Sequence, residues 1–460
     1  MRNRPFLLFL LCQIILSSAL VAQTQGPEPY DSLAHQIVKE ALGTSTAYGM
    51  LSDLCTNIGH RLSGSPAAAK AVQWAERKME ELGFDNVHLE PVMVPHWVRG
   101  PVERACVLDP SGKRENLAIA ALGGTIGTPR EGITAEVLEV ESFEELHKLG
   151  DKAKGKIIFF NRPMDRTLVN TFEAYGGAVD QRGVGAVEAA KVGGVAALVR
   201  SMTTRHDNVP HTGAMHYDDS VKQVPAAAVS IIGAERLSGL LASGKPVRIH
   251  MEFSAQTLPD VESANVVGEL TGTEKPEEVI VIGGHLDSWD KGEGANDDGS
   301  GCVQSIEALR LLKSIGLKPK RTIRAVMFMN EENGLRGGIA YAEKQRPGEK
   351  TIAAIESDMG SFMPEGFGIS DSVAYEKLLR WAPVFRFINA DHFQLGGGGA
   401  DISPLARQGV PLLDLIPEVQ RYFDYHHSDS DTIENVNERE LALGAAALTI
   451  LSYIIGQEGL

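Results

Sequence analysis

The sequence is poor in cysteine and has no excess of positive charge. Only 4 of its 460 residues are cysteines. Cys12 lies in an N-terminal apolar run behind Leu11, and the other three, Cys55, Cys106 and Cys302, cannot form a disulfide framework. Lys and Arg total 44 against 60 Asp and Glu, so no global positive field exists to hold a phosphate backbone. These shortages argue against a disulfide-stapled fold and against a nucleic-acid partner.

The one long apolar run stands at the N-terminus. Arg2 and Arg4 precede apolar residues from Phe6 onward, and small residues follow up to Ala22. This layout is typical of a secretory signal peptide, so we predict that residues 1–22 form one and that the mature protein is secreted or periplasmic. The run is shorter than the roughly 20 residues of a spanning helix. We interpret no later stretch as spanning, and expect no membrane contact after cleavage.

The length predicts two or three structural units, because single cores stop growing near about 250 to 300 residues. We divide the mature chain at residues 23–110, 111–255 and 256–460. The first part contains a helix with Ser65 as N-cap and Pro66 at its first position. In the middle part, strand-like runs alternate with glycine-rich turns, and residues suited to catalysis are sparse. We interpret it as an inserted module with its own small core.

The last part alternates short apolar runs with helical patterns. Strands are predicted at residues 279–282, 323–329, 352–355 and 412–416, and helices at residues 300–315 and 438–455. Such alternation favours an α/β fold, a sheet covered by helices on both faces. In that architecture ligands bind beyond the carboxyl ends of the strands.

Acidic and imidazole side chains follow each predicted strand. They are His285 and Asp287, then Asp297 in the loop 294–299, then Glu331 and Glu332, then Asp358, and finally His426 and His427. Each motif alone is compatible with a solvated turn, and the loop 294–299 also with a calcium-type loop. Gathered in one crevice, these groups would repel one another unless cations lay between them. The set therefore predicts a metal site.

The absence of His-Glu-x-x-His and Cys-x-x-Cys leaves only a dispersed site. Mixed imidazole and carboxylate ligands suit zinc, although they also accept cobalt or manganese, and many carboxylates suit a metal pair with a bridging acid. Two metals would lower the pKa of a shared water from about 15.7 to about 7, and a nearby carboxylate would accept its proton. His426 and His427 would point to opposite faces of an extended segment, so we expect only one of them to be a ligand.

Four segments carry a resemblance to a known family over nearly the whole mature chain. Residues 283–301, Glu331-Glu332, 356–360 and 426–432 resemble the M28 family of co-catalytic zinc exopeptidases. The resemblance implies two zinc ions per subunit, with Glu331 as general base. It assigns the ligands as follows: His285 and Asp358 for one ion, Glu332 and His427 for the other, and Asp297 as the bridge.

Further site residues are predicted with less support from the motifs. Asp287 lies two residues beyond His285 and is expected to orient its imidazole through the carboxylate. Some family members place a tyrosine near Ala400-Asp401, where this sequence has glycines at 396–399. We hypothesise that backbone N–H groups of the glycine run line the substrate. The candidate substrate-binding residues are Gly397, Gly398, Asp401 and His426.

The resemblance implies a secreted dizinc exopeptidase that hydrolyses dipeptides or terminal residues of short peptides. It also implies that the middle module is a protease-associated domain and that the protein is a homodimer. Two alternatives stay open at this point: a non-catalytic binding protein similar to transferrin receptors, and an acyltransferase similar to glutaminyl cyclases. Side-chain preference and the choice between amino-terminal and carboxy-terminal recognition do not follow from the sequence.

Overall fold

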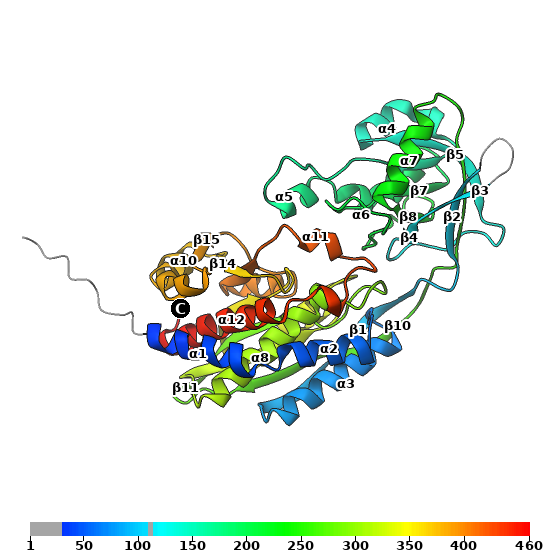
Figure 1. Cartoon of the computed structure of the whole chain (residues 1–460). Helices are drawn as coiled ribbons and strands as arrows, with labels where there is room; N and C mark the ends of the chain where they lie inside the picture. Colours follow the sequence, from blue (N-terminus) through cyan, green and yellow to red (C-terminus); the bar gives the residue numbers. More distant parts are fainter. Residues whose placement is uncertain (1–29, 109–113) are drawn as a thin grey trace, which may run out of the picture.

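The computed structural model describes residues 30–108 and 114–460, which form two eight-stranded sheets (Figure 1). The predicted signal peptide at residues 1–22, Cys12 included, lies outside the described residues, as does the predicted boundary at residue 110. The part of the chain from Glu103 to Phe253 forms the second sheet and is called the second module below. The rest forms the first sheet with its helices.

The elements of the first sheet and its surroundings have the following bounds. The strands are β1 (Asp85–Val98), β10 (Gln256–Leu270), β11 (Lys275–His285), β12 (Arg321–Phe328), β13 (Lys350–Glu356), β14 (Pro364–Ile369), β15 (His392–Leu395) and β16 (Leu412–Pro417). The α-helices are α1 (Asp31–Thr44), α2 (Ala47–Asn57), α3 (Pro66–Glu81), α8 (Ser300–Ser314), α9 (Arg336–Glu343), α10 (Ser372–Leu379), α11 (Tyr422–Tyr425) and α12 (Glu438–Glu458). Short helical turns are η2 (Ala295–Gly299), η3 (Ala382–Ile388), η4 (Ser403–Gln408) and η5 (Ile433–Asn435).

The α/β prediction is confirmed at the centre of the first sheet, whose strand order is β1-β10-β12-β11-β13-β16-β14-β15. The four predicted strands became β11, β12, β13 and β16, which are mutually parallel. The edge of the sheet formed by β1 and β10 was not predicted. These two strands form a long antiparallel ribbon. The predicted boundary at residues 255 and 256 coincides with the start of β10. Pro259 stands where the register against β1 shifts, a position that tolerates a missing N–H.

Helices cover both faces of the central strands, as predicted. Ile280 and Ile282 of β11 face a core shared with α1, α2, α8 and α12, while Val279 and Val281 face α9 and η4. Among the described residues, α12 alone is long and apolar enough to span a membrane, which the sequence analysis overlooked. However, 89% of its most apolar window is buried inside the protein, where it packs on α8 and α1.

The helix predicted from Ser65 is α3, and its cap is confirmed. The Ser65 hydroxyl accepts a hydrogen bond from the Ala68 N–H at 3.1 Å, and Pro66 occupies the first helical position. Ala71, Ala75 and Met79 are buried on one face of the helix, which packs on β10 and β1. This packing fixes the end of the loop that contains Arg61 and leads into α3.

The second module has its own sheet, in the order β3-β2-β9-β5-β6-β7-β8-β4. Its elements are β2 (Glu103–Leu108), β3 (Arg114–Leu117), β4 (Ile119–Ala121), β5 (Ile133–Val140), α4 (Phe143–Leu149), η1 (Gly150–Ala153), β6 (Ile157–Phe160), α5 (Thr171–Gly176), α6 (Asp180–Lys191), β7 (Ala196–Arg200), β8 (Ala226–Val229), α7 (Ile231–Leu241) and β9 (Arg248–Phe253). Two separate apolar clusters lie on its faces, so it has its own core. Figure 1 shows it over one end of the first sheet, with α5 and α6 toward α11.

Candidate active site

The predicted residues converge at the carboxyl ends of β11, β12 and β13. His285 ends β11, Glu331 and Glu332 follow β12, and Asp358 follows β13. A cavity of about 290 Å³ lies at this edge. Its lining residues are Phe172, Tyr175, Arg182, Asp297, Glu331, Glu332, Asp358, Tyr422, Phe423, His426 and His427.

Five side chains form two clusters that share one carboxylate. His285 Nε2 lies 3.2 Å from Asp297 Oδ1 and 3.4 Å from Asp358 Oδ1. On the other side, His427 Nε2 lies 3.3 Å from Asp297 Oδ2 and 3.1 Å from Glu332 Oε2. Asp297 therefore stands between the two clusters with one oxygen toward each, a position compatible with the bridging role that the family resemblance implies.

The donor atoms of these clusters fit divalent metal ions. His285 Nε2, Asp297 Oδ2 and Asp358 Oδ1 are buried and have no hydrogen-bond partner among the described residues. Buried polar atoms without partners are costly unless a ligand satisfies them. Imidazole nitrogens with carboxylate oxygens are the donors that zinc and similar ions take.

Residues not named as candidates fix the loop that carries Asp297. Asp431 accepts hydrogen bonds from the Asn296 N–H at 2.8 Å and the Asp297 N–H at 3.1 Å. The Arg61 guanidinium is fully buried and donates to the carbonyls of Leu286, at 2.5 Å, and Gly294, at 2.8 Å. Neither residue was predicted as part of the site: Asp431 lies in the segment 426–432 that carries the family resemblance, but that motif does not reveal a partner far along the chain.

Asp298 fixes the backbone that carries His285. Its carboxylate accepts hydrogen bonds from the His285 N–H at 3.0 Å and the Gly301 N–H at 2.9 Å. Burial, and then the charge of Asp358, raise the pKa of Asp298 well above its ordinary value. Asp298 is not among the residues that line the cavity. It therefore positions the end of β11 and does not face the substrate.

Burial dominates the electrostatics of the cavity. It raises the pKa of Glu331 to about 8, with Asp358 and Asp297 adding to the rise and His285 opposing it. It lowers the pKa of His427 to about 3, against the pull of Asp297. Burial thus favours the neutral forms of Glu331 and His427. Against burial, the nearby carboxylates raise the pKa of His285, and the two histidines lower the pKa of Asp297.

We predicted that the carboxylate of Asp287 orients the imidazole of His285, but the backbone carbonyl of Asp287 makes that contact. The His285 Nδ1 lies 2.9 Å from the backbone carbonyl of Asp287, while the carboxylate Oδ1 is 4.0 Å away. That oxygen instead accepts hydrogen bonds from the N–H groups of Asn330, at 2.6 Å, and Glu331, at 3.2 Å. The chain turns after His285, so the carboxylate of Asp287 fixes the loop of the predicted base.

The expectation that His426 and His427 point to opposite faces is also wrong. Their rings stack with centroids 3.5 Å apart, and both line the cavity. His427 has φ +60°, so the segment is not extended and the two side chains do not alternate. His426 Nε2 lies 3.9 Å from Asp297 Oδ2, farther than His427 Nε2, which leaves His427 as the better-placed ligand.

The candidate substrate residues near the glycine run do not line the cavity. The Gly398 N–H donates to Asp414 Oδ1 at 2.7 Å, so the hypothesis that it faces substrate is wrong. A Cβ on Gly397 would collide with the same carboxylate. Asp401 is buried behind the site, next to Glu356, and neither of its carboxylate oxygens has a partner among the described residues.

The second module contributes to the cavity, which the sequence did not reveal. Phe172 and Tyr175 of α5 and Arg182 of α6 line it. Phe172 stacks on Tyr422 at 5.2 Å and Tyr175 on Phe423 at 4.7 Å, so aromatic pairs join the module to α11. The module thus closes one side of the metal-binding clusters.

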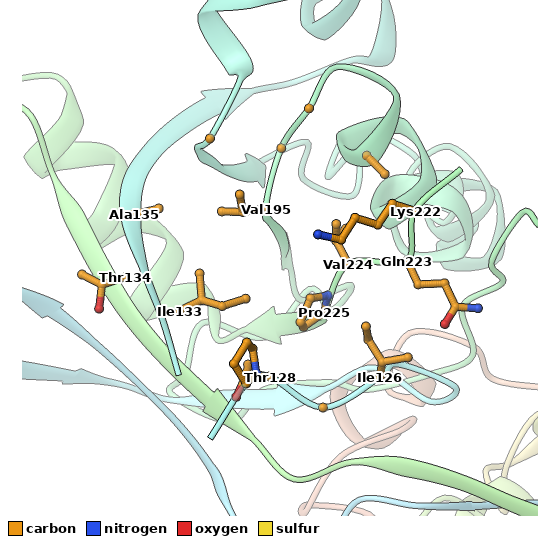
Figure 2. Close-up of a pocket in the computed structure, with 16 residues that line it drawn as sticks. Ile126, Thr128, Ile133, Thr134, Ala135, Val195, Lys222, Gln223, Val224 and Pro225 are labelled. Carbon is orange, nitrogen blue, oxygen red and sulfur yellow. The ribbon is translucent and has the colours of Figure 1, made fainter. Parts of the chain in front are cut away.

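A second cavity, of about 640 Å³, lies within the second module (Figure 2). Ile126, Ile133, Val195 and Pro225 are among its lining residues, and Lys222 is the one charged residue of that lining. It contains no carboxylate or imidazole that could serve in hydrolysis. The chemistry of the molecule therefore lies in the smaller cavity.

Comparison with known proteins adds independent support. The model of peptidase family M28 matches residues 265–453. The chain is 37% identical to carboxypeptidase Q of Bos taurus over 98% of both chains. It resembles the crystal structure of a peptidase M28 precursor from Shewanella amazonensis, with a TM-score of 0.89 and 34% identity over 94% of this chain and 97% of that one. A zinc aminopeptidase from Bacillus subtilis, at 21% identity over 90% and 95% of the two chains, shares the fold with a TM-score of 0.66.

Proposed function

The chain belongs to peptidase family M28 and is a metallo-exopeptidase, and from that premise we propose that it hydrolyses dipeptides or terminal residues of short peptides with two zinc ions. The observation that carries the proposal is Asp297, whose two oxygens face the two clusters at 3.2 and 3.3 Å. His285 and Asp358 would hold one ion, and Glu332 and His427 the other. When bound, the ions polarise the scissile carbonyl and acidify water.

Glu331 is the general base of the proposed reaction. It lines the cavity beside the clusters, and its N–H is held by Asp287. Its carboxylate takes a proton from the attacking water as the oxygen joins the carbonyl carbon. It then delivers that proton to the leaving amine as the C–N bond breaks. Glu331 is partly buried, and its backbone is held next to the clusters by Asp287.

Three further assignments belong to the same proposal. The second module is a protease-associated domain that narrows access to the cavity. The protein is secreted or periplasmic, as the predicted signal peptide at residues 1–22 indicates, and acts as a homodimer. The zinc aminopeptidase named among the structural relatives supports zinc as the metal. We set aside the alternatives similar to transferrin receptors and glutaminyl cyclases, because the relatives named above are peptidases and the five proposed ligands lie together in the two clusters.

The test is hydrolysis of unblocked dipeptides by the zinc-loaded enzyme, with and without chelator. We expect the chelator to abolish hydrolysis and added zinc to restore it. Glu331→Gln keeps the shape of the side chain but removes the base, so kcat should fall by about 10² to 10⁴ while bound metal is unchanged. Normal turnover in this variant would show that Glu331 is not the base, and chelator-resistant hydrolysis would refute the metal mechanism.

A further inference from the structure

The second module contacts the backbone on both sides of His427, the proposed metal ligand. The His211 Nδ1 lies 2.6 Å from the carbonyl oxygen of His426, and the Thr212 N–H donates to the carbonyl oxygen of His427 at 2.9 Å. Both residues of the module are buried, with exposed fractions of 1% for His211 and 0% for Thr212. They lie between β7 and β8, so these contacts come from a different part of the module than the cavity wall formed by α5 and α6.

These two hydrogen bonds fix the backbone conformation of His427. A peptide unit is planar, and the two accepting carbonyls belong to the peptide units on either side of the His427 Cα. Holding both planes determines the φ and ψ of the residue between them. His427 has φ +60°, a conformation that a non-glycine residue rarely adopts and that persists where the surrounding contacts over-determine it. The second module supplies that constraint.

His211 is a neutral imidazole that uses its one N–H for this contact. Burial lowers the pKa of His211 to about 4, although the hydrogen bond to the His426 carbonyl opposes the shift. A neutral ring carries one N–H, and because a carbonyl oxygen only accepts, the proton is on Nδ1. The Nε2 atom is buried without a partner among the described residues, which disfavours a histidine at this position. The one side-chain hydrogen bond of His211 within the described chain therefore goes to the segment that carries His427.

The two donors are themselves held by the sheet of the second module. The Ser201 hydroxyl accepts a hydrogen bond from the His211 N–H at 2.9 Å and donates to the Val229 carbonyl, at the end of β8, at 2.8 Å. The Thr212 hydroxyl donates to the carbonyl of Ala121, the last residue of β4, at 2.8 Å. The position of both donors therefore depends on how the module as a whole packs against the first sheet.

We infer that His211 and Thr212 are positioning residues for His427, through which the second module strengthens metal binding at that ligand. The inference rests on the proposed function and adds to it a role of the second module in holding one of the two ions. The His427 Nε2 lies 3.1 Å from Glu332 Oε2, and it keeps this place only while its backbone keeps the observed turn.

The two ions should respond differently to a change in these contacts. His285 and Asp358, the proposed ligands of one ion, follow strands of the first sheet and lie outside the segment that the second module holds. The ion at Glu332 and His427 depends on that segment. A change at His211 should therefore weaken one ion much more than the other.

The experiment is zinc titration of the chelator-stripped protein in competition with a chromophoric chelator, which resolves the affinities of the two ions. His211→Leu removes the N–H donor, and we expect it to weaken one ion by about 10- to 100-fold, the usual effect of losing a group that orients a metal ligand, while the other ion binds as in the wild-type protein. His211→Asn places an amide N–H near the position of Nδ1 and should restore most of the affinity. His206→Leu, at an exposed histidine of the same module that pairs with Glu235, is the matched control and should keep both affinities.

A second measurement needs no variant. If zinc binds better while His427 is held, bound zinc must in turn favour the contacts that hold it. Hydrogen exchange of the Thr212 N–H should therefore slow when zinc is added to the stripped wild-type protein. The Gly155 N–H, which donates to the Gly193 carbonyl elsewhere in the second module, should exchange at the same rate with and without zinc.

Two wild-type affinities in His211→Leu overturn the inference alone, and so does a His211→Leu protein in which both ions weaken in equal proportion, because that result indicates a general loss of structure. A His211→Asn protein that binds zinc as weakly as His211→Leu shows that the hydrogen bond to His426 is not the cause. Exchange at Thr212 that does not respond to zinc also overturns the inference. If the wild-type protein binds fewer than two zinc ions, the proposed two-ion site itself fails.

Discussion

At the scale of single residues, Glu90 shows how a buried carboxylate depends on its cations. It stands on β1, is 5% exposed, and accepts hydrogen bonds from Arg346 at 2.7 and 2.8 Å and from Lys344 at 3.0 Å. Burial opposes its ionisation, but His88, Arg346 and Lys344 outweigh burial and lower the pKa of Glu90 to about 2. Ionised Glu90 therefore stabilises the junction between β1 and the segment after α9.

The pH dependence of this contribution has a definite sign. Because the folded pKa of about 2 is below the ordinary value of 4.5, the stabilisation is complete above about pH 4.5 and is lost as the pH falls toward 2. We expect Glu90→Gln to lower the free energy of unfolding at pH 7 by about 1 to 3 kcal/mol, with the difference from wild type shrinking below pH 4.5. Urea unfolding at several pH values measures it.

Glu80→Gln, on the exposed side of α3, is the control and should change stability by less than about 0.5 kcal/mol. A Glu90→Gln deficit that stays constant from pH 7 to pH 3 would contradict the assignment. The sequence could not have singled out Glu90, because its two cationic partners Lys344 and Arg346 lie more than 250 positions away. By contrast, His285 and Glu332 were predictable, since their place at a strand end was visible locally.

At the scale of elements, the loop that carries Asp297 depends on a different loop. Asp431 receives the N–H groups of Asn296 and Asp297 and so orients the bridging carboxylate. Residues that orient metal ligands typically contribute 10- to 100-fold to metal affinity. We expect Asp431→Asn to weaken zinc binding by about that factor, measured by competition with a chromophoric chelator.

Asp429→Asn is a matched control two residues away, since Asp429 is exposed and, within the described part of the chain, accepts only a long, 3.4 Å hydrogen bond from the Gly292 N–H. Its zinc affinity should equal that of wild type. Equal affinity in both variants would show that the loop holds Asp297 without Asp431. Strands and helices were predictable from apolar runs and caps, as with Ser65. The turn at His427 was not, because histidine adopts a negative φ far more often than the positive φ observed here, so the residue type does not mark the turn.

At the scale of the whole molecule, Arg99 ties the two sheets together. Its guanidinium binds Asp290 through two hydrogen bonds of 2.5 and 2.9 Å and Glu103 at 2.8 Å, and it also reaches the carbonyl of Ala121. Asp290 lies in the loop after β11, whereas Glu103 and Ala121 belong to the second module. Trp289 packs on Trp97 and over Gly123 beside this network. The second module is therefore anchored next to the site.

Arg99→Gln should leave the largely buried carboxylate of Asp290 without its cation, whereas Glu103 keeps its contact with Lys291. We expect it to lower the stability of the protein by about 3 kcal/mol, as when one member of a buried ion pair is removed, and to bring forward unfolding of the second module in calorimetry. Arg104→Gln, an exposed surface pair with Glu252, is the control and should have little effect. An unchanged melting profile in Arg99→Gln would show that the aromatic contacts alone hold the module.

The sequence did not allow us to predict how the second module packs against the first sheet. Composition and glycine-rich turns indicated a separate middle module, but not that Tyr175 and Arg182 reach the cavity across it. Such contacts depend on how two independently packed sheets meet, which no local pattern records. The candidate metal ligands could be predicted from the sequence, because parallel strands bring their carboxyl ends to one edge of a sheet.

The most direct test of the account is the number of metal ions per chain, measured by zinc titration of the chelator-stripped protein with elemental analysis. We predict two zinc ions per chain in the wild-type protein and in Glu331→Gln, and loss of bound zinc in Asp297→Ala, because both clusters share that carboxylate. One ion or none in the wild-type protein, or an undiminished count in Asp297→Ala, would contradict the account.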